Sequence, residues 1–185
     1  FGDAYRDGPL TLGMHKRGSH YDIVETDRCE LVHEDLNLAL RETLRFFRER
    51  KVPFYHKLRH EGYLRFLLAR RGTHRKELLL DLVTSSQLPT EEERELLRAW
   101  RELMCSLPFE ASLKGLLHTV TDSVADAVKN ERTDVLFGEA QFEEELSGLR
   151  FAITPFSFFQ NNADGAELLY EKVGQYVGET GGKVV

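Results

Sequence analysis

Residues 151–162 read FAITPFSFFQNN, and this stretch decides the fold class of the chain. A short apolar strand runs into a loop that is broken by Pro155 and carries three Phe and a Gln-Asn-Asn run. A helix follows at 166–173, where apolar residues recur at helical spacing, and a new apolar run begins at 183–185. We therefore expect the entrance to a parallel α/β domain, with a domain boundary near residue 151.

The segment upstream of that boundary predicts pairs of strands with helices between them. Alternating apolar residues at 9–15, and again after the turn at 16–19, predict an antiparallel hairpin. The apolar runs 63–70 and 77–84 predict a second hairpin, with a basic tip between them. Further strands are expected at 112–121, 133–137 and 149–154.

Two helices are expected among these strands. Apolar residues repeat at helical spacing through 35–50, and Pro53 ends that helix. The sequence TEEE at 90–93 has the capping-box pattern and begins a second helix, which places Cys105 on its apolar side. Together these elements predict an α+β fold, in which an antiparallel sheet is flanked by helices on one side.

Length and composition limit the class of protein. A chain of 185 residues holds one sizeable core, or one domain with the edge of a second. No run of about eighteen apolar residues is present, so we expect no membrane span, and we expect no signal peptide before the fold. Because the chain starts at Phe1 and stops on an apolar run, we expect it to be cut from a longer polypeptide. Cys29 and Cys105 show no Cys-x-x-Cys spacing, which favours a reducing, cytoplasmic setting.

The net charge of −6 hides a basic window at 45–76. This window holds eleven Lys or Arg against two acidic residues, a charge of +9, so the rest of the chain carries −15. Clustered basic charge is the electrostatic footprint of phosphate contacts. A solvated surface explains the same run equally well on sequence alone.

The loop after residue 155 carries side chains suited to recognising a base. Phe158 and Gln160 alternate around Phe159, so on an extended backbone they point to the same side. An aromatic face beside a carboxamide can stack on a base and hydrogen-bond its edge. The alternative is that all three Phe are core residues and that Gln160 caps the following helix.

The residues quoted above resemble the RNA (uracil-5-)-methyltransferase family, most closely its bacterial 23S ribosomal RNA members. The likeness covers most of the chain and is most specific in the loop that contains Gln160. It is carried by Phe151, Pro155, SFFQ at 157–160, Asn162, AELLY at 166–170, LFG at 136–138, GLRF at 148–151 and LRHEGYLR at 58–65.

The resemblance implies a division of the chain and a set of site residues. Residues 1–150 correspond to a central α+β domain with the RNA-facing window 45–76. Residues 151–185 correspond to the first helix and strand of a truncated, Rossmann-like methyltransferase domain. Gln160 then contacts S-adenosylmethionine and Phe158 lies near the target uracil, while Asn162 supports the cofactor or, as we prefer, caps the helix. The side chains expected to contact ribosomal RNA are Lys57, Arg59, Arg65, Arg70, Arg71 and Arg75.

Some members of that family hold a four-iron four-sulfur cluster, and Cys29 matches the position of its fourth cysteine ligand. The other three ligands would lie upstream of Phe1. One thiolate cannot hold such a cluster, so we expect no cluster in this chain even if its parent has one. Cys29 as an ordinary half-buried thiol is an equally good interpretation.

The resemblance also implies the chemistry of the parent enzyme. A cysteine thiolate adds to the uracil ring, and the neighbouring ring carbon accepts the methyl group from S-adenosylmethionine. A carboxylate base then removes the ring proton, and the cysteine leaves. Neither the nucleophilic cysteine nor this base has a counterpart here, so we expect the chain alone to be inactive. We expect its partners to be ribosomal RNA and the remainder of its own polypeptide. The alternatives are an RNA-docking module and a purely structural or protein-interaction domain, both without catalytic activity.

Overall fold

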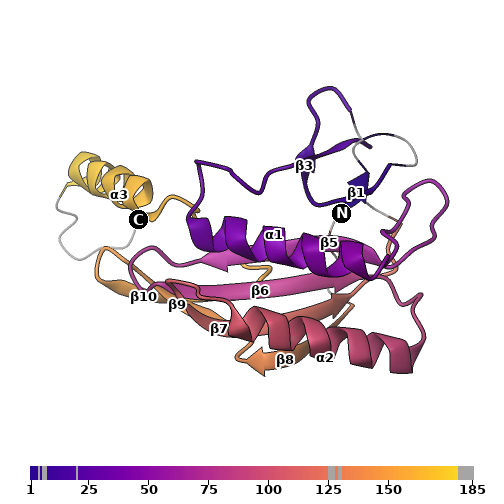
Figure 1. The fold of residues 1–185 in the computed structure, drawn as a ribbon. Helices are drawn as coiled ribbons and strands as arrows, with labels where there is room; N and C mark the ends of the chain where they lie inside the picture. The colour runs from indigo at the N-terminus through magenta and orange to yellow at the C-terminus, as the bar shows by residue number, and fades with distance from the viewer. Residues whose placement is uncertain (4, 6–7, 20, 125–127, 129–130, 179–185) are drawn as a thin grey trace.

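The computed structural model describes residues 1–3, 5, 8–19, 21–124, 128 and 131–178 (Figure 1). Two helices cover one face of a four-stranded sheet, and a hairpin lies on the other side (Figure 1). The expected α+β class is confirmed. No helix in the described part of the chain is both long and apolar enough to cross a bilayer.

The central sheet has the strand order β5-β6-β7-β8. Its hairpin of β5 and β6 is antiparallel, as expected, and so is the pairing of β7 with β8. The pairing of β6 with β7 is parallel, which the expected all-antiparallel sheet did not include, because helix α2 carries the chain back between them. The strands are Leu64–Arg71 (β5), Glu77–Thr84 (β6), Ser112–Val120 (β7) and Arg132–Gly138 (β8).

Helices α1, Glu34–Glu49, and α2, Thr90–Ser106, pack on one face of this sheet. Their buried side chains meet alternate residues of the strands, since residues two apart in a strand share a face. Aromatic rings contact one another in this core: Phe47 stacks on Trp100 with ring centroids 6.4 Å apart. The buried members of this core are Ala39, Phe46, Phe47, Tyr63, Leu64, Leu78, Leu80, Leu82, Leu97, Trp100, Met104, Ala111 and Leu116.

The N-terminal region forms two small strand pairs instead of one long hairpin. Strand β3, Gly13–His15, pairs with β4, Ile23–Glu25, across the expected turn, so this hairpin is confirmed. The first part of the expected strand, β2 at Leu10–Thr11, pairs instead with β1 at Gly2–Asp3.

A hairpin that the sequence did not predict covers part of the other face of the sheet. Strand β9, Phe142–Leu146, pairs with the expected strand β10, Leu149–Ile153. Phe142 and Ile153 pack against Leu79 and Leu117 of the central sheet. The boundary that we propose near residue 151 thus falls inside β10, a strand that contributes to this second core.

Helix α3, Ala163–Val177, follows the loop after β10 and extends from one end of the molecule (Figure 1). It confirms the expected final helix, three residues earlier than the sequence pattern suggested. The strand expected at 183–185 lies outside the described residues.

Two details of helix α2 differ from expectation. Its N-cap is Pro89, without a side-chain cap hydrogen bond, so the expected capping box is wrong. Glu93 instead accepts a hydrogen bond from the Tyr63 hydroxyl at 3.1 Å, because the interior of the fold provides this donor. Cys105 is exposed, and its expected place on the buried side was also wrong, since Trp100 and Met104 occupy that side.

One carboxyl group is buried in the sheet with incomplete hydrogen bonding. Asp81 of β6 is 1% exposed; its Oδ2 accepts from the Thr119 hydroxyl at 2.8 Å, and its Oδ1 has no partner among the described residues. Burial raises the pKa of Asp81 from 3.8 to about 6, although the Thr119 hydrogen bonds oppose this shift. The folded state therefore binds this proton more tightly than the unfolded state does, and stability is lost as the pH rises through this range.

Replacing Asp81 with Asn removes this penalty and leaves a group of the same shape. The quantity of interest is the free energy of unfolding of Asp81→Asn minus that of the wild type. We expect this difference to rise by about 2 kcal/mol from pH 4 to pH 8. Urea denaturation at the two pH values measures this change. Glu102→Gln on the exposed face of α2 is the matched control and should stay within about 0.5 kcal/mol at both. A pH-independent difference for Asp81→Asn would contradict the burial of an ionisable carboxyl.

Candidate functional site

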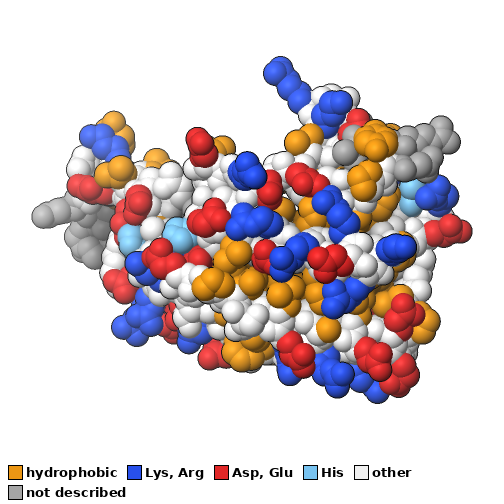
Figure 2. Space-filling view, in the orientation of Figure 1, with side chains coloured by type: hydrophobic (Ala, Val, Ile, Leu, Met, Phe, Trp, Pro, Cys, Tyr) orange, Lys and Arg blue, Asp and Glu red, His pale blue; other side chains and the backbone are white. Residues whose placement is uncertain are grey.

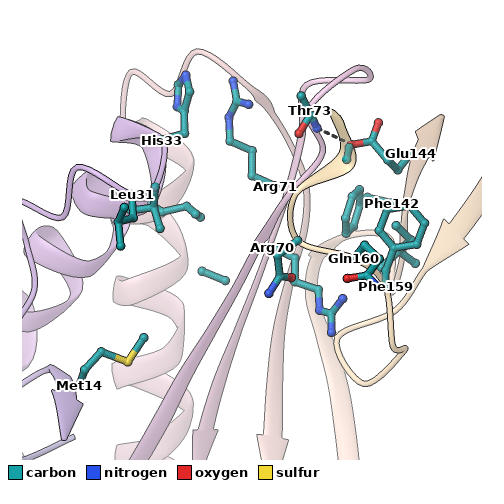
Figure 3. Close-up of a pocket in the computed structure, with 16 residues that line it drawn as sticks. Met14, Leu31, His33, Arg70, Arg71, Thr73, Phe142, Glu144, Phe159 and Gln160 are labelled. Carbon is teal, nitrogen blue, oxygen red and sulfur yellow. Dashed lines mark hydrogen bonds between the residues drawn. The ribbon is translucent and has the colours of Figure 1, made fainter. Parts of the chain in front are cut away.

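A cavity of about 560 Å³ lies beside the edge strand β5, where three separate parts of the chain meet (Figure 3). Residues 31–33 before α1 form one side, and the end of β5 forms the floor. The loop between β10 and α3 closes the other side. The polar groups that line the cavity are His33, Arg70, Arg71, Thr73, Glu144, Gln160 and Asn161.

The β5–β6 turn at this cavity is held by a single buried carboxylate. Glu144 of β9 is 2% exposed and accepts hydrogen bonds from the backbone N–H groups of Thr73, His74 and Arg75, the last two at 3.1 and 3.2 Å. Successive N–H groups that point at one anion form a nest, which binds negative charge. A side chain at Gly72 would press on this carboxylate, with its Cβ 3.2 Å from Glu144 Oε2. The turn and β9 are thus joined closely.

A second buried carboxylate fixes the floor of the cavity. Asp35, at the start of α1, accepts from Arg71 Nε at 2.9 Å and from the backbone N–H groups of Glu110 and Ala111 at 2.8 and 3.0 Å. Burial opposes ionisation of Asp35, but these hydrogen bonds outweigh it and hold its pKa below the ordinary value. The Arg71 side chain is 10% exposed and paired in this way, so it holds the fold together.

The loop after β10 turns sharply before it reaches α3. Ser157 Oγ lies 2.8 Å from Thr154 Oγ1 and accepts from the Thr154 N–H, which fixes the turn after Pro155. Asn162 is the N-cap of α3, and its Oδ1 accepts from the Gly165 N–H at 2.8 Å. The preferred interpretation of Asn162 as a helix cap agrees with this geometry.

The three Phe of this loop do not share one environment. Phe159 packs in the cores beneath it and lies 5.6 Å from the Phe151 ring, whereas Phe158 is 86% exposed. Gln160 is also exposed and lines the cavity (Figure 3). The structure therefore places Phe159 in the core and leaves Phe158 and Gln160 accessible to a ligand.

Arg70 is the basic residue that the structure brings close to this loop. Its Nε donates to the Pro155 carbonyl at 3.1 Å, and its guanidinium lines the same cavity as Gln160 (Figure 3). Burial lowers the pKa of Arg70 from its ordinary value, but an Arg side chain remains charged in a protein. A cation and a carboxamide therefore face one hollow.

On the face drawn in Figure 2, acidic side chains lie among the basic ones. Several other basic residues of the window pair with acidic side chains from elsewhere in the chain. Arg65 does not fit its expected role in RNA contact: it is 5% exposed and donates to the Thr121 carbonyl at 2.8 Å, under the Tyr55 ring. Arg75 remains exposed but lies 3.5 Å from Glu143. Much of the positive charge thus serves internal ion pairs.

The remaining expected RNA contacts lie in the loop between α1 and β5. Lys57 Nζ is 3.4 Å from His15 Nε2, and Arg59 is exposed. Arg59 shares a hollow of about 380 Å³ with Arg48 and Lys51, which the sequence analysis did not single out. Lys51 and Arg59 converge there from the end of α1 and the following loop, and the residues that line this hollow include no acidic side chain.

Cys29 lies between β4 and α1 and is partly exposed. Its backbone N–H donates to Asn37 Oδ1 at 3.2 Å, and its carbonyl accepts from Asn37 Nδ2 at 3.1 Å. One cysteine does not make a cluster site, so an iron-sulfur cluster in the parent stays a prediction.

The donors present fit one part of a nucleoside cofactor site. The exposed Gln160 carboxamide offers both a donor and an acceptor beside Arg70 and an apolar wall that includes Phe142. The Asn162 side chain already caps α3. Of the two residues that the resemblance assigns to the cofactor, Gln160 is therefore the better placed to contact it.

The acidic run around Glu144 hides its role in the sequence. It lies in the run Glu143–Glu145, which is typical of a solvated surface. The only signal was that Phe142, Glu144 and Leu146 alternate, which would put Glu144 on the buried face of a strand.

No family model matches the chain. Two curated relatives match it along nearly its whole length, and both are described as uncharacterized RNA methyltransferases. The relative from Clostridium tetani is 40% identical over 185 residues, which are 100% of this chain and 40% of the relative. The relative from Caldanaerobacter subterraneus subsp. tengcongensis is 42% identical over 180 residues, or 97% and 39%. The chain thus spans about two fifths of the length of these relatives.

The fold is similar to that of the Pyrococcus abyssi tRNA (uracil-54, C5)-methyltransferase, solved in complex with S-adenosyl-L-homocysteine. The TM-score is 0.66 at 23% sequence identity, over 90% of this chain and 38% of that chain. At this identity the likeness shows the fold alone. The chain is therefore homologous to a segment of bacterial RNA methyltransferases. The expected resemblance to RNA methyltransferases is confirmed by these relatives.

The role of Glu144 can be measured by removing its charge. In Glu144→Gln one amide oxygen must replace a carboxylate that serves three backbone N–H groups, so we expect a loss of about 2–3 kcal/mol in the free energy of unfolding. Hydrogen exchange at residues 73–75 should also accelerate. Glu143→Gln, at the neighbouring exposed position, is the control and should cost less than about 0.5 kcal/mol. Equal stability of the two variants would show that the nest does not hold the turn.

Proposed function

We propose that this chain belongs to an S-adenosylmethionine-dependent enzyme that methylates the 5-position of a uridine in ribosomal RNA. The observation that carries the proposal is the exposed Phe158–Gln160 loop beside a cavity that contains Arg70, in a chain homologous to RNA methyltransferases. The ribosomal target rests on the sequence resemblance.

In this proposal the two exposed side chains of the loop have different roles. The exposed ring of Phe158 offers a face on which a flipped-out uracil can stack. The uracil must leave the RNA helix, because an enzyme cannot reach the ring carbon that it methylates while the base is stacked. The Gln160 carboxamide orients S-adenosylmethionine by hydrogen bonds, and the bound cofactor supplies the methyl group. The adjacent cation of Arg70 attracts a phosphate or the carboxylate of the cofactor.

Methyl transfer itself needs groups outside this chain. The proposed nucleophile is a cysteine that activates the uracil ring by adding to it. Cys105 is a poor candidate, because it lies on the outer side of α2 and partial burial raises the pKa of its thiol. Cys29 is not among the residues that line the cavity, although residues 31–33 on the same β4–α1 connection are. We therefore propose that the chain alone transfers no methyl group. In the enzyme it docks the RNA and contributes part of the cofactor site.

Helix α3 supports the proposed partnership with the remainder of the polypeptide. Several apolar side chains on this helix are exposed among the described residues, including Leu168 at 69% and Tyr176 at 81%. Exposed apolar groups on one element are typical of a surface that packs against another part of a protein. A stand-alone RNA-docking or structural module is the second candidate, and the basic hollow around Arg59 favours its RNA-binding form.

The role of Gln160 is tested in the full-length protein. We expect Gln160→Ala to reduce the rate of methyl transfer to RNA about tenfold or more, because it removes hydrogen bonds to the cofactor but leaves the buried core intact. The measurement is incorporation of labelled methyl groups, with cofactor affinity from calorimetry. Gln141→Ala, at an exposed glutamine between β8 and β9 that does not line the cavity, is the control and should retain most activity. Wild-type cofactor affinity in Gln160→Ala would contradict this role.

The docking role is tested by reversing one charge in the basic hollow. We expect Arg59→Glu to weaken binding of a ribosomal RNA stem-loop about three- to tenfold at low salt, and to reduce the dependence of affinity on salt. Fluorescence anisotropy over a salt series measures both. Arg98→Glu, on the exposed face of α2, is the control with the same charge change. Equal losses in the two variants would indicate a general charge effect, and salt-independent binding would exclude phosphate contacts.

A further inference from the structure

Three metal-ligating side chains from two elements converge at the junction of the β5–β6 turn and α3. His74 lies in the turn, and Asp164 and Glu167 lie near the start of α3. One ligand atom from each lies within 4.8 Å of the others. His74 Nε2 is 3.8 Å from Asp164 Oδ1 and 3.7 Å from Glu167 Oε2.

This spacing is close to that of a metal site. Metal–ligand bonds of about 2.0–2.1 Å in a tetrahedral site put the ligand atoms about 3.4 Å apart. The two distances from His74 Nε2 therefore need to shorten by only a few tenths of an ångström. Asp164 and Glu167 are three residues apart on a helix, which places both carboxylates on one side. A histidine with two carboxylates is a donor set suited to divalent transition metals.

The surrounding structure orients the ligands. Glu167 Oε1 accepts from the Ser147 N–H at 2.6 Å, which leaves Oε2 directed at His74. The His74 backbone is held by the Glu144 nest, since its N–H donates to that carboxylate at 3.1 Å. Hydrogen bonds that fix ligands in this way are a regular feature of metal sites.

The charge of the cluster also favours a cation. Within the described residues, His74 is the basic group in ion-pair range of either carboxylate, so two negative charges face one imidazole. The side chains of His74 and Glu167 are 35% and 34% exposed, which leaves room for water to complete the coordination. The positive end of the α3 dipole opposes a cation at this place, so we expect affinity in the micromolar range.

We propose that His74, Asp164 and Glu167 bind a divalent transition-metal ion such as Zn²⁺, which joins the β5–β6 turn to α3. The ion is structural: it tethers the helix that follows the Gln160 loop to the turn held by Glu144. Binding at this position restrains the wall of the cavity that contains Gln160 and Asn161. The site does not depend on the function proposed above, because its ligands all belong to the described chain.

The test uses the purified chain and Zn²⁺ as the probe. Calorimetry should show one Zn²⁺ per chain, and saturating Zn²⁺ should raise the midpoint of thermal unfolding. His74→Gln should weaken binding at least about tenfold and abolish the thermal shift. Glu171→Gln, one turn further along α3, is the matched control and should leave both unchanged. Co²⁺ spectra should show nitrogen and oxygen ligation in the wild type and lose this signature in His74→Gln.

Two results would overturn the proposal. The first is the absence of saturable Zn²⁺ binding below about 100 micromolar in the folded wild-type chain, which would leave the cluster as an ion pair of His74. The second is Zn²⁺ binding of equal affinity in wild type, His74→Gln and Asp164→Asn, which would place the ion elsewhere. Circular dichroism of each variant confirms that the comparison is between folded proteins.

Discussion

The Glu144 carboxylate is the constraint on which the candidate site depends. Three backbone N–H groups of the β5–β6 turn converge on it, and it is buried under that turn. A buried carboxylate is costly unless it is fully hydrogen-bonded, so its position and that of the turn determine each other. Because Glu144 lies on β9, the same interaction positions the β9–β10 hairpin and the loop that follows it.

The ion pair of Asp35 and Arg71 fixes the opposite side of the same cavity. It joins the start of α1 to the end of β5 and to the backbone before β7. Together with Glu144 it holds the floor and one wall, so that Arg70, next to Arg71 on the other face of β5, is held beside the Gln160 loop. Two buried carboxylates therefore organise a basic segment that would otherwise repel itself.

This organisation changes the meaning of the basic window. A charge of +9 at 45–76 suggested one extended phosphate-binding face. In the structure Arg65 and Arg71 stabilise the interior, while Arg48, Arg75 and Lys76 pair with acidic side chains that are distant in sequence. The basic residues best placed to meet RNA are a smaller group around Arg59 and Arg70.

The sequence alone determined the class of the fold, most of its strands and helices, and the resemblance to RNA methyltransferases. Hydrophobic periodicity and turn residues are local signals, so the hairpin at 63–84, both long helices and the helix after Asn162 could be predicted from them. Alternation correctly separated Phe158 and Gln160 from Phe159.

Tertiary structure alone decided which charged residues are available. The parallel pairing of β6 with β7, the burial of Arg65 and the nest around Glu144 depend on contacts between residues far apart in the chain. Local patterns carry no information on such pairings, and an acidic run such as 143–145 looks solvated until its partner strand is known. The convergence of His74, Asp164 and Glu167 has the same origin, because about ninety residues separate the turn from the helix that it meets.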